Sequence, residues 1–468
     1  MLTYPLDKKK GVSLYEQLYG YIREDILRRR LAAGEKLPSK RALAAHLEIS
    51  VVTVENAYDQ LAAEGYIRSE EKRGYFVCPV EGTAAESAGG GASRRPETPE
   101  EPAWFLDFVT NAPAAEYFPF DTWARLMRRT ILDRSTDLLR PTPSTGALEL
   151  RQAIAAWLRA FRGMDVSAER IVLGAGTESL YGLLIKLLGR DRRYAVEDPG
   201  YGKIARIYES DAVTVRRVPL DESGLSVEAL RRSDAQVVHI SPSHHYPTGI
   251  VMPIGRRQEL LRWAGEKEGR WILEDDYDSE FRFVGRPIPA LFSSDENGRV
   301  IYLNTFSKTI APSIRMSYMI LPPALMAEYR RRLGFYACAV SSFEQYTLAA
   351  FLDQGHYERH LSRMKTRYHQ KRDAVIAAIR AGLPRSEITE QDAGLHFLVR
   401  LDTDLPDGTL RRRAAERGIR LALLSDYYAD PSRAPSHVLV VNYSGIQTDR
   451  LAQGLRLLNE IMEGNEHV

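Results

Sequence analysis

One break in composition divides this chain of 468 residues. Residues 79–103, PVEGTAAESAGGGASRRPETPEEPA, are rich in Gly, Ala, Ser, Pro and Glu and show no apolar periodicity. Such a segment cannot bury enough apolar surface to offset the entropy of ordering it. We therefore predict two separate folded parts, residues 1–78 and 104–468. The flexible linker between them spans roughly 25–30 Å on average as a coil.

Charge and cysteine content narrow the class of protein. The 64 Lys and Arg nearly balance the 62 Asp and Glu, which excludes a histone-like basic protein and a solvating acidic one. Two cysteines, Cys78 and Cys338, make neither a disulfide scaffold nor a zinc site on their own. No apolar run approaches the roughly 18 residues of a membrane span, and the N-terminus lacks a signal-peptide core. We expect a cytoplasmic protein with no metal site and no membrane partner.

Apolar spacing in residues 1–78 predicts three short helices and a hairpin. Leu18, Ile22 and Ile26 recur at helical spacing within residues 12–30. A second helix is expected after Ser39 and a third over 51–64, with serines positioned as N-caps. Residues 66–68 and 75–77 alternate like paired strands. Helix, turn, helix and β-wing form a winged helix-turn-helix, whose third helix reads the major groove of double-stranded DNA.

The side chains that such a module would turn toward an operator are polar or basic. The N-terminal part carries 13 Lys and Arg against 11 Asp and Glu, so charge alone is weak support. A plain helical bundle with a solvated hairpin turn is the competing interpretation. The candidate DNA-binding residues are Ser39, Lys40, Arg41, Ser50, Val51, Thr53, Asn56, Lys72 and Arg73.

Residues 34–77, GEKLPSKRALAAHLEISVVTVENAYDQLAAEGYIRSEEKRGYFV, resemble the DNA-binding domain of the GntR superfamily. The shared pattern is L-P-S-x-R-x-L-A-x-x-L, then S-x-x-T-V-x-x-A-Y-x-x-L-x-x-E-G-Y, then a wing containing glycine. The resemblance implies DNA binding. One position departs from it, because Val51 follows the capping serine where the family often has an arginine.

Strand-like and helical segments alternate through residues 104–468. Apolar runs at 171–176, 193–199, 212–219, 235–241, 270–276, 299–305 and 317–322 are separated or flanked by helical patterns such as 177–189 and 256–268. This alternation predicts an α/β domain with a mostly parallel, helix-covered sheet. Ligands of such sheets bind at the carboxyl ends of the strands.

Three of these strand ends carry polar groups, and each has a plain structural alternative. Residues 173–179, LGAGTES, run from strand to helix, where free N–H groups favour a phosphate, although a simple strand–helix connection is the more frequent explanation of such a segment. Residues 274–278, EDDYD, are costly to bury unless paired with a cation, a metal or a protonated ring nitrogen. They are otherwise a solvated loop. In 305–315, TFSKTIAPSIR, Lys308 is either a Schiff-base lysine or a surface lysine.

Together the three segments match one cofactor, pyridoxal 5′-phosphate (PLP), which needs a lysine, a carboxylate at its ring nitrogen and a phosphate cup. Their order resembles the fold-type I aminotransferases, whose large domain is joined to a smaller C-terminal subdomain. The resemblance implies that Lys308 forms the Schiff base and that Asp275 pairs with the pyridine nitrogen. It further implies that Tyr277 binds the ring O3′ and that Tyr201 stacks on the ring. The implied phosphate ligands are Thr177, Glu178, Thr305, Ser307 and Arg315.

A GntR-type reader linked to an aminotransferase-like domain resembles the MocR/GabR-type transcriptional regulators over essentially the whole chain. That resemblance implies a head-to-tail homodimer that binds PLP and controls genes of vitamin B6 or amino-compound metabolism. We expect the effector to be a small amino compound or PLP itself. An active aminotransferase that carries a reader, and a DNA-binding repressor with a degenerate sensor, remain alternatives.

Three departures bear on catalysis. Pro141, preceded by Arg140, stands where the aminotransferases have a tyrosine that reaches the partner's phosphate. Val440 stands where aminotransferases usually have an arginine that grips the substrate carboxylate, and Tyr246 replaces the usual asparagine before Pro-Thr-Gly. His244 or His245 is a candidate substitute for that asparagine. Lys203 is the candidate effector-binding residue in place of the arginine, with Arg420 and Arg433 weaker. Full transamination is therefore the less favoured expectation.

Overall fold

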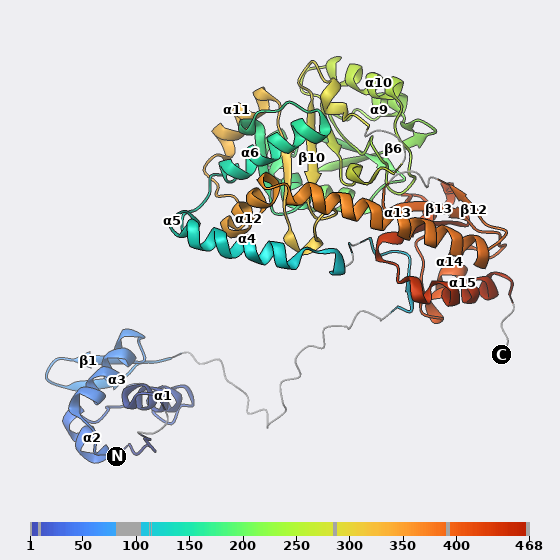
Figure 1. Cartoon of the computed structure of the whole chain (residues 1–468). Helices are drawn as coiled ribbons and strands as arrows, with labels where there is room; N and C mark the ends of the chain where they lie inside the picture. The colour runs from blue at the N-terminus through green and yellow to red at the C-terminus, as the bar shows by residue number, and fades with distance from the viewer. Residues whose placement is uncertain are drawn as a thin grey trace. The chain divides into compact units, whose positions relative to one another are not determined.

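The computed structural model describes residues 2–7, 11–80, 104–111, 113, 115–283, 288–389 and 394–464. The chain divides into two compact units, Met1–Glu101 and Pro102–Val468, and each is considered by itself (Figure 1). Most of the predicted linker, residues 81–103, lies outside the described residues.

The N-terminal unit has the predicted order of elements. Its helices are α1 (Leu14–Leu27), α2 (Lys40–Leu47) and α3 (Val51–Ala63), followed by the antiparallel pair β1 (Ile67–Glu70) and β2 (Gly74–Val77). The Ser39 hydroxyl accepts a hydrogen bond from the Ala42 amide, and the Ser50 hydroxyl accepts one from the Thr53 amide. Both serines are therefore N-caps, as predicted, and the module is a winged helix-turn-helix.

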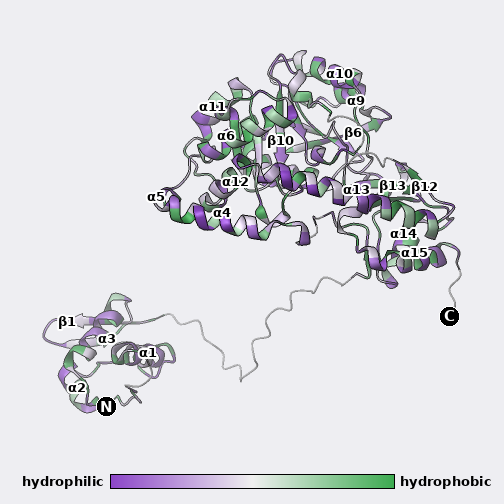
Figure 2. Ribbon diagram, in the orientation of Figure 1, coloured by the Kyte–Doolittle hydropathy of each residue, from purple (hydrophilic) through white to green (hydrophobic). Residues whose placement is uncertain are grey.

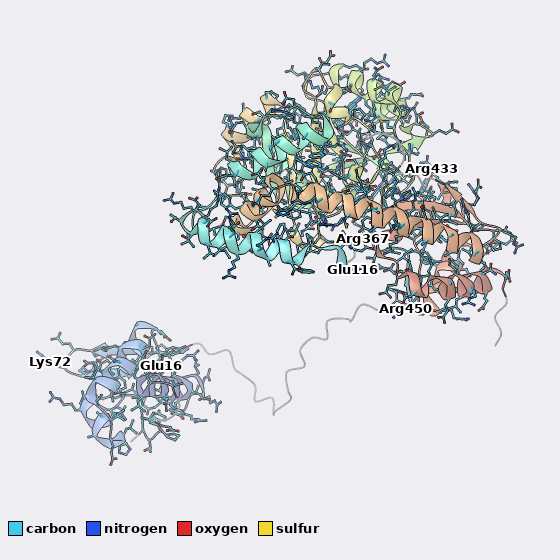
Figure 3. All side chains as sticks on the ribbon, in the orientation of Figure 1. Glu16, Lys72, Glu116, Arg367, Arg433 and Arg450 are labelled. Atoms are coloured by element: carbon cyan, nitrogen blue, oxygen red, sulfur yellow. The ribbon has the colours of Figure 1, made fainter. Side chains whose placement is uncertain are left out.

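One core holds the three helices and the wing together. Leu18, Ile22, Val54, Tyr58 and Leu61 are completely buried in it. The buried face of α3 is thus the side that packs against α1 and the wing. Lys72, at the turn between the strands, is exposed and projects from the wing (Figure 3).

The larger unit is built on an eight-stranded sheet with the order β4-β11-β10-β9-β8-β5-β6-β7. The central strands are parallel, whereas β11 and β7 are antiparallel to their neighbours. The strands are β4 (Ile171–Gly174), β5 (Arg193–Asp198), β6 (Thr214–Asp221), β7 (Gly224–Leu225), β8 (Val237–Ile240), β9 (Trp271–Asp275), β10 (Val300–Thr305) and β11 (Ser317–Ile320). The predicted mostly parallel sheet is confirmed.

Helices cover both faces of this sheet. Alternate strand residues separate the two faces: Leu273 and Leu303 pack in one apolar cluster, Ile272 and Val300 in another. Hydrophobic and hydrophilic residues share these covering helices (Figure 2). The first face carries α7 (Thr177–Leu188), α8 (Gly202–Ser210) and α11 (Pro323–Leu333); the second carries α6 (Leu148–Trp157), α9 (Val227–Arg232), α10 (Ile254–Gly265) and α12 (Ser342–Asp353).

A smaller subdomain completes the unit, and the helix α13 (His356–Gly382) extends to it from the side of α12 (Figure 1). Its antiparallel sheet has the order β12-β13-β15. The segment that opens this unit also belongs here, because β3 (Leu106–Asp107) pairs with β14 (Ile419–Arg420). The remaining elements are α14 (Asp407–Glu416), α15 (Thr448–Met462), β12 (Glu387–Thr389), β13 (His396–Arg400) and β15 (Val438–Asn442).

The helices α4 (Phe120–Asp133) and α5 (Ser135–Leu138) precede the strands of the large sheet in the sequence. They run along the large part of the unit (Figure 1). Among the described residues, no helix combines the length and apolar character needed to cross a membrane.

Candidate functional site

A cavity of about 580 Å³ lies at the carboxyl ends of the central parallel strands. Its walls come from β5, β8, β9 and β10, from the N-terminal turns of α7 and α8, and from the subdomain. All ten predicted cofactor and effector residues line it: Thr177, Glu178, Tyr201, Lys203, Asp275, Tyr277, Thr305, Ser307, Lys308 and Arg315.

Lys308 lies in the turn that follows β10 and reaches across the cavity. Its Nζ donates a 2.6 Å hydrogen bond to the backbone carbonyl of Asn111, in the segment after β3. Burial lowers the pKa of the Lys308 ammonium, against the opposing charge of Asp278. A lowered pKa increases the fraction of neutral amine, which is the form that attacks an aldehyde.

The N-terminus of α7 and Arg315 form a cup whose groups suit an anion. Gly176 precedes α7 with a φ of 85°, and a Cβ there would lie 2.5 Å from Nη2 of Arg315. Only glycine therefore lets the guanidinium approach the free N–H groups of the helix. Glu178 accepts hydrogen bonds from Arg315, at 3.3 Å, and from Lys203. This combination of helix N-terminus and arginine fits a phosphate.

Thr305 and Ser307 shape the turn beside the cup. The Thr305 hydroxyl accepts hydrogen bonds from the Ser307 amide at 3.1 Å and from the Ser317 hydroxyl at 2.8 Å. Thr305 is buried and thus holds the turn in place, whereas Ser307 is partly exposed at the cavity. Their predicted role as phosphate ligands stays a prediction.

The three consecutive carboxylates at the end of β9 have three separate environments. Glu274 accepts hydrogen bonds from the backbone amides of Leu291 and Phe292, both at 2.7 Å. Asp276 forms a buried 2.7 Å ion pair with Arg162. Only Asp275 lines the cavity, so the acidic run is neither a solvated loop nor a shared cation site.

Asp275 keeps one oxygen available. Its Oδ2 accepts a 2.6 Å hydrogen bond from the Tyr181 hydroxyl and lies 3.4 Å from Nε2 of His239. Its Oδ1 is buried and has no hydrogen-bond partner among the described residues. A buried carboxylate oxygen without a donor is costly, and the protonated ring nitrogen of PLP supplies one. The residues present therefore fit this cofactor.

Tyr277 is held by a buried pair of side chains, His244 and Asp278. Its hydroxyl lies 3.3 Å from Nδ1 of His244, which in turn lies 2.9 Å from Oδ2 of Asp278. The ring of His396 packs 4.5 Å from that of His244. His245 points elsewhere, to the hydroxyl of Thr248 at 2.7 Å. Of the two candidate histidines, His244 is therefore the one beside Tyr277.

Val440 occupies the position where aminotransferases have a carboxylate-binding arginine, and its surroundings in the structure are also apolar. Val440 is completely buried in β15 and packs with Leu398, Ala422 and Leu424. Tyr246 packs against the same cluster, and its hydroxyl lies 2.7 Å from that of Tyr427.

Comparisons with known proteins cover both units. Residues 14–77 match the family described as "Bacterial regulatory proteins, gntR family", and residues 106–427 match "Aminotransferase class I and II". The chain is 33% identical to the probable rhizopine catabolism regulatory protein MocR of Rhizobium meliloti, over 97% of this chain and 94% of that protein. It is 31% identical to the pyridoxine biosynthesis regulator PdxR of Corynebacterium glutamicum, over 91% of each. The chain belongs to the MocR/GabR-type family of transcriptional regulators.

The effector domain of this MocR/GabR-type regulator has the aminotransferase fold. The Pyrococcus horikoshii kynurenine aminotransferase superposes with a TM-score of 0.68 at 24% identity, covering 79% of this chain and 93% of that one. The HTH-type transcriptional regulator YdeL of Bacillus subtilis is 35% identical over 97% of each chain. The family thus combines both domains in one chain, as predicted.

In the DNA-binding domain of the regulator, the predicted DNA-binding residues differ in whether their side chains are exposed or are engaged in contacts within the domain. Val51 and Asn56 on α3, Arg41 on α2 and Lys72 on the wing are exposed. Arg73 on the wing is also exposed, but it forms a 2.6 Å ion pair with Glu70. The remaining four are engaged within the domain. Ser39 and Ser50 serve as caps, the Thr53 hydroxyl lies 2.8 Å from that of Ser50, and Lys40 forms a 2.8 Å ion pair with Glu55.

Proposed function

We propose that this chain is a PLP-dependent, DNA-binding transcriptional regulator that senses a small amino compound, or PLP, through its aminotransferase-like domain. One observation carries the proposal. A lysine with a lowered pKa, an available buried carboxylate oxygen and an anion-binding helix N-terminus line the same cavity.

Each group has a distinct task toward the cofactor. Arg315 and the N-terminal amides of α7 would hold the phosphate, and Asp275 would keep the ring nitrogen protonated. Tyr277, oriented by His244, would hold O3′. When bound, PLP supplies an aldehyde carbon whose bond to the Lys308 nitrogen can be exchanged for one to an incoming primary amine, with Lys308 released as a free amine.

Regulation requires that the effector bind two arrangements of the protein with different affinity. We propose that the regulator acts as a head-to-tail homodimer in the cytoplasm, because two readers bind an operator with two half-sites. An apolar surface along α4 supports an interface between copies. It is lined by Phe120, Trp123, Met127, Ile131 and Leu132, and Phe120 is 67% and Leu132 71% exposed. Isolated exposed residues of this size are ordinary, but a contiguous row on one helix favours a partner.

Spectroscopy of the full-length protein tests the cofactor. Added PLP is expected to give a visible absorbance band that disappears in Lys308→Ala. The matched control is Lys365→Ala, since Lys365 also has a pKa lowered by burial but does not line the cavity. A band that survives Lys308→Ala would overturn the assignment.

DNA binding tests the regulatory role. Gel-shift experiments on the promoters that flank the gene, with and without PLP and candidate amines, are expected to show binding that the ligand changes. No binding to any of these promoters under any condition would contradict the regulator proposal. Multiple turnovers with an amino donor and 2-oxoglutarate would instead favour an active aminotransferase that carries a reader.

A further inference from the structure

We infer that the effector of this regulator is a primary amine that carries no carboxylate, and that a pair of tyrosine hydroxyls binds its distal polar group. The inference rests on the proposed function, because it concerns the same cavity and the same cofactor. It comes from the charges and hydrogen bonds of the cavity wall that lies between the subdomain and the loop after β8.

That wall consists of Tyr246, from the loop after β8, and Tyr427, from the turn before β15. Their hydroxyl oxygens are 2.7 Å apart, and Nδ2 of Asn442 donates to the Tyr246 hydroxyl at 3.3 Å. Behind them lies Val440, which is completely buried. The wall is therefore uncharged, with an apolar backing.

The cations that line the cavity are engaged elsewhere. Lys203 pairs with Glu178, and Arg217 pairs with Glu209 at 3.4 Å. Arg315 also pairs with Glu178, and in the proposed site it holds the cofactor phosphate. Lys308 donates to the carbonyl of Asn111 and is the group that reacts with the cofactor. A carboxylate against the tyrosine wall would be desolvated without a cation, which is strongly unfavourable.

The tyrosine pair suits a hydroxyl or a second amino group. One hydroxyl hydrogen is shared between Tyr246 and Tyr427, so the other is available to a ligand. Burial raises the pKa of both phenols, which keeps them neutral and able to donate. Each oxygen also retains acceptor capacity. The wall thus offers one hydrogen-bond donor and several acceptors. A hydroxyl or an amino group on the ligand can donate to these acceptors, whereas a carboxylate can only accept.

The test compares amines with the amino acids that differ from them only by a carboxylate. Ethanolamine is paired with serine and putrescine with ornithine, and each is titrated into the full-length, PLP-loaded protein. Cofactor absorbance and operator affinity are both recorded. The carboxylate-free member of each pair is expected to bind at least about 10-fold more tightly, equivalent to about 1.4 kcal/mol.

Two variants locate the recognition. Tyr427→Phe removes one hydroxyl but keeps the ring, and is expected to weaken amine binding about 5-fold or more. Its matched control is Tyr428→Phe, because Tyr428 packs against the same apolar cluster but does not line the cavity. Equal effects of the two substitutions would overturn the role of the tyrosine pair.

The ligand titrations need no variant, so a folding defect cannot obscure the result. Tighter binding of serine than of ethanolamine, or of ornithine than of putrescine, overturns the inference and leaves the proposed function intact. Loss of amino-acid binding in Lys203→Gln would then show that Lys203 binds the carboxylate. No response to any amine also overturns the inference and leaves PLP itself as the effector. Failure of PLP to give a Lys308-dependent band overturns the proposed function instead.

Discussion

The hydroxyl of Tyr181 donates a 2.6 Å hydrogen bond to Oδ2 of Asp275 and leaves Oδ1 of the same carboxylate without a partner among the described residues. Tyr181 lies on α7, whose N-terminus forms the anion-binding cup, and Asp275 ends β9. One helix therefore orients two features of the proposed cofactor site, the carboxylate and the cup proposed for the phosphate.

Asp275→Asn is expected to weaken PLP binding about 10- to 150-fold. The amide no longer provides a charged partner for the ring nitrogen, and such a hydrogen bond contributes about 1.5–3 kcal/mol. Absorbance titration with PLP measures the change, and the thermal unfolding midpoint without PLP checks that the variant is folded. Unchanged PLP affinity in a folded variant would contradict the assigned role of Asp275.

Asp276→Ala is expected to destabilise the larger unit by about 3–5 kcal/mol, because it leaves Arg162 buried without a counterion. All five tryptophans lie in residues 104–468, so tryptophan fluorescence in a denaturant titration reports on this unit alone. The control is Asp133→Ala, which removes an exposed ion pair with Arg129 and should cost less than about 1 kcal/mol. Similar losses in the two variants would show that Asp276 is not structural.

Glu197→Gln is expected to flatten the pH dependence of stability in the PLP-free protein. Burial raises the pKa of Glu197 from 4.5 to about 8, so its contribution is fully present below pH 4.5 and is lost as the pH rises through 8. Over that interval it contributes a slope of up to about 1.4 kcal/mol per pH unit. Glutamine mimics the protonated form, and its amide can donate to the unpartnered Nε2 of His245.

Denaturant titrations from pH 5 to pH 9 measure this effect. The variant and the native protein should be similarly stable at pH 5, and the variant should be the more stable of the two at pH 9. A residual slope is expected in both, because burial also raises the pKa values of Glu274 and Glu280 to about 7. Parallel stability curves for the two proteins would refute the prediction.

Arg41→Ala is expected to weaken DNA binding almost equally for all sequences. Arg41 is exposed on α2, and loss of one phosphate contact reduces the slope of log affinity against log salt by about 1 per reader. Binding curves at several salt concentrations measure that slope. The control, Arg28→Ala, removes an exposed arginine at the end of α1 and should leave the slope as it is. A changed base preference in Arg41→Ala would mean that Arg41 reads bases rather than phosphates.

The sequence predicted elements well where the signal was local. Serine caps, helical spacing in α1 and alternation in the wing are decided within a few residues, and the structure has them at those positions. The strand ends could also be predicted to meet, because carboxyl ends of parallel strands share one edge of a sheet.

The partners of individual polar side chains could not be predicted in this way. Asp275 and Tyr181 are 94 positions apart, and Asp276 and Arg162 are 114 apart. Nothing in EDDYD distinguishes the residue that faces the cavity from the one that neutralises an arginine. Similarly, His396 meets His244 only because β13 of the subdomain packs against the loop after β8.

The contact between Lys308 and Asn111 has a consequence for signalling. Asn111 belongs to the first described stretch of the larger unit, which also places β3 against β14. When the Lys308 nitrogen bonds to a cofactor, it can no longer donate in the same way to the Asn111 carbonyl. Under the proposed function, a cofactor bound at Lys308 would therefore change a contact in the first described stretch of the larger unit, which follows the segment that joins the two units.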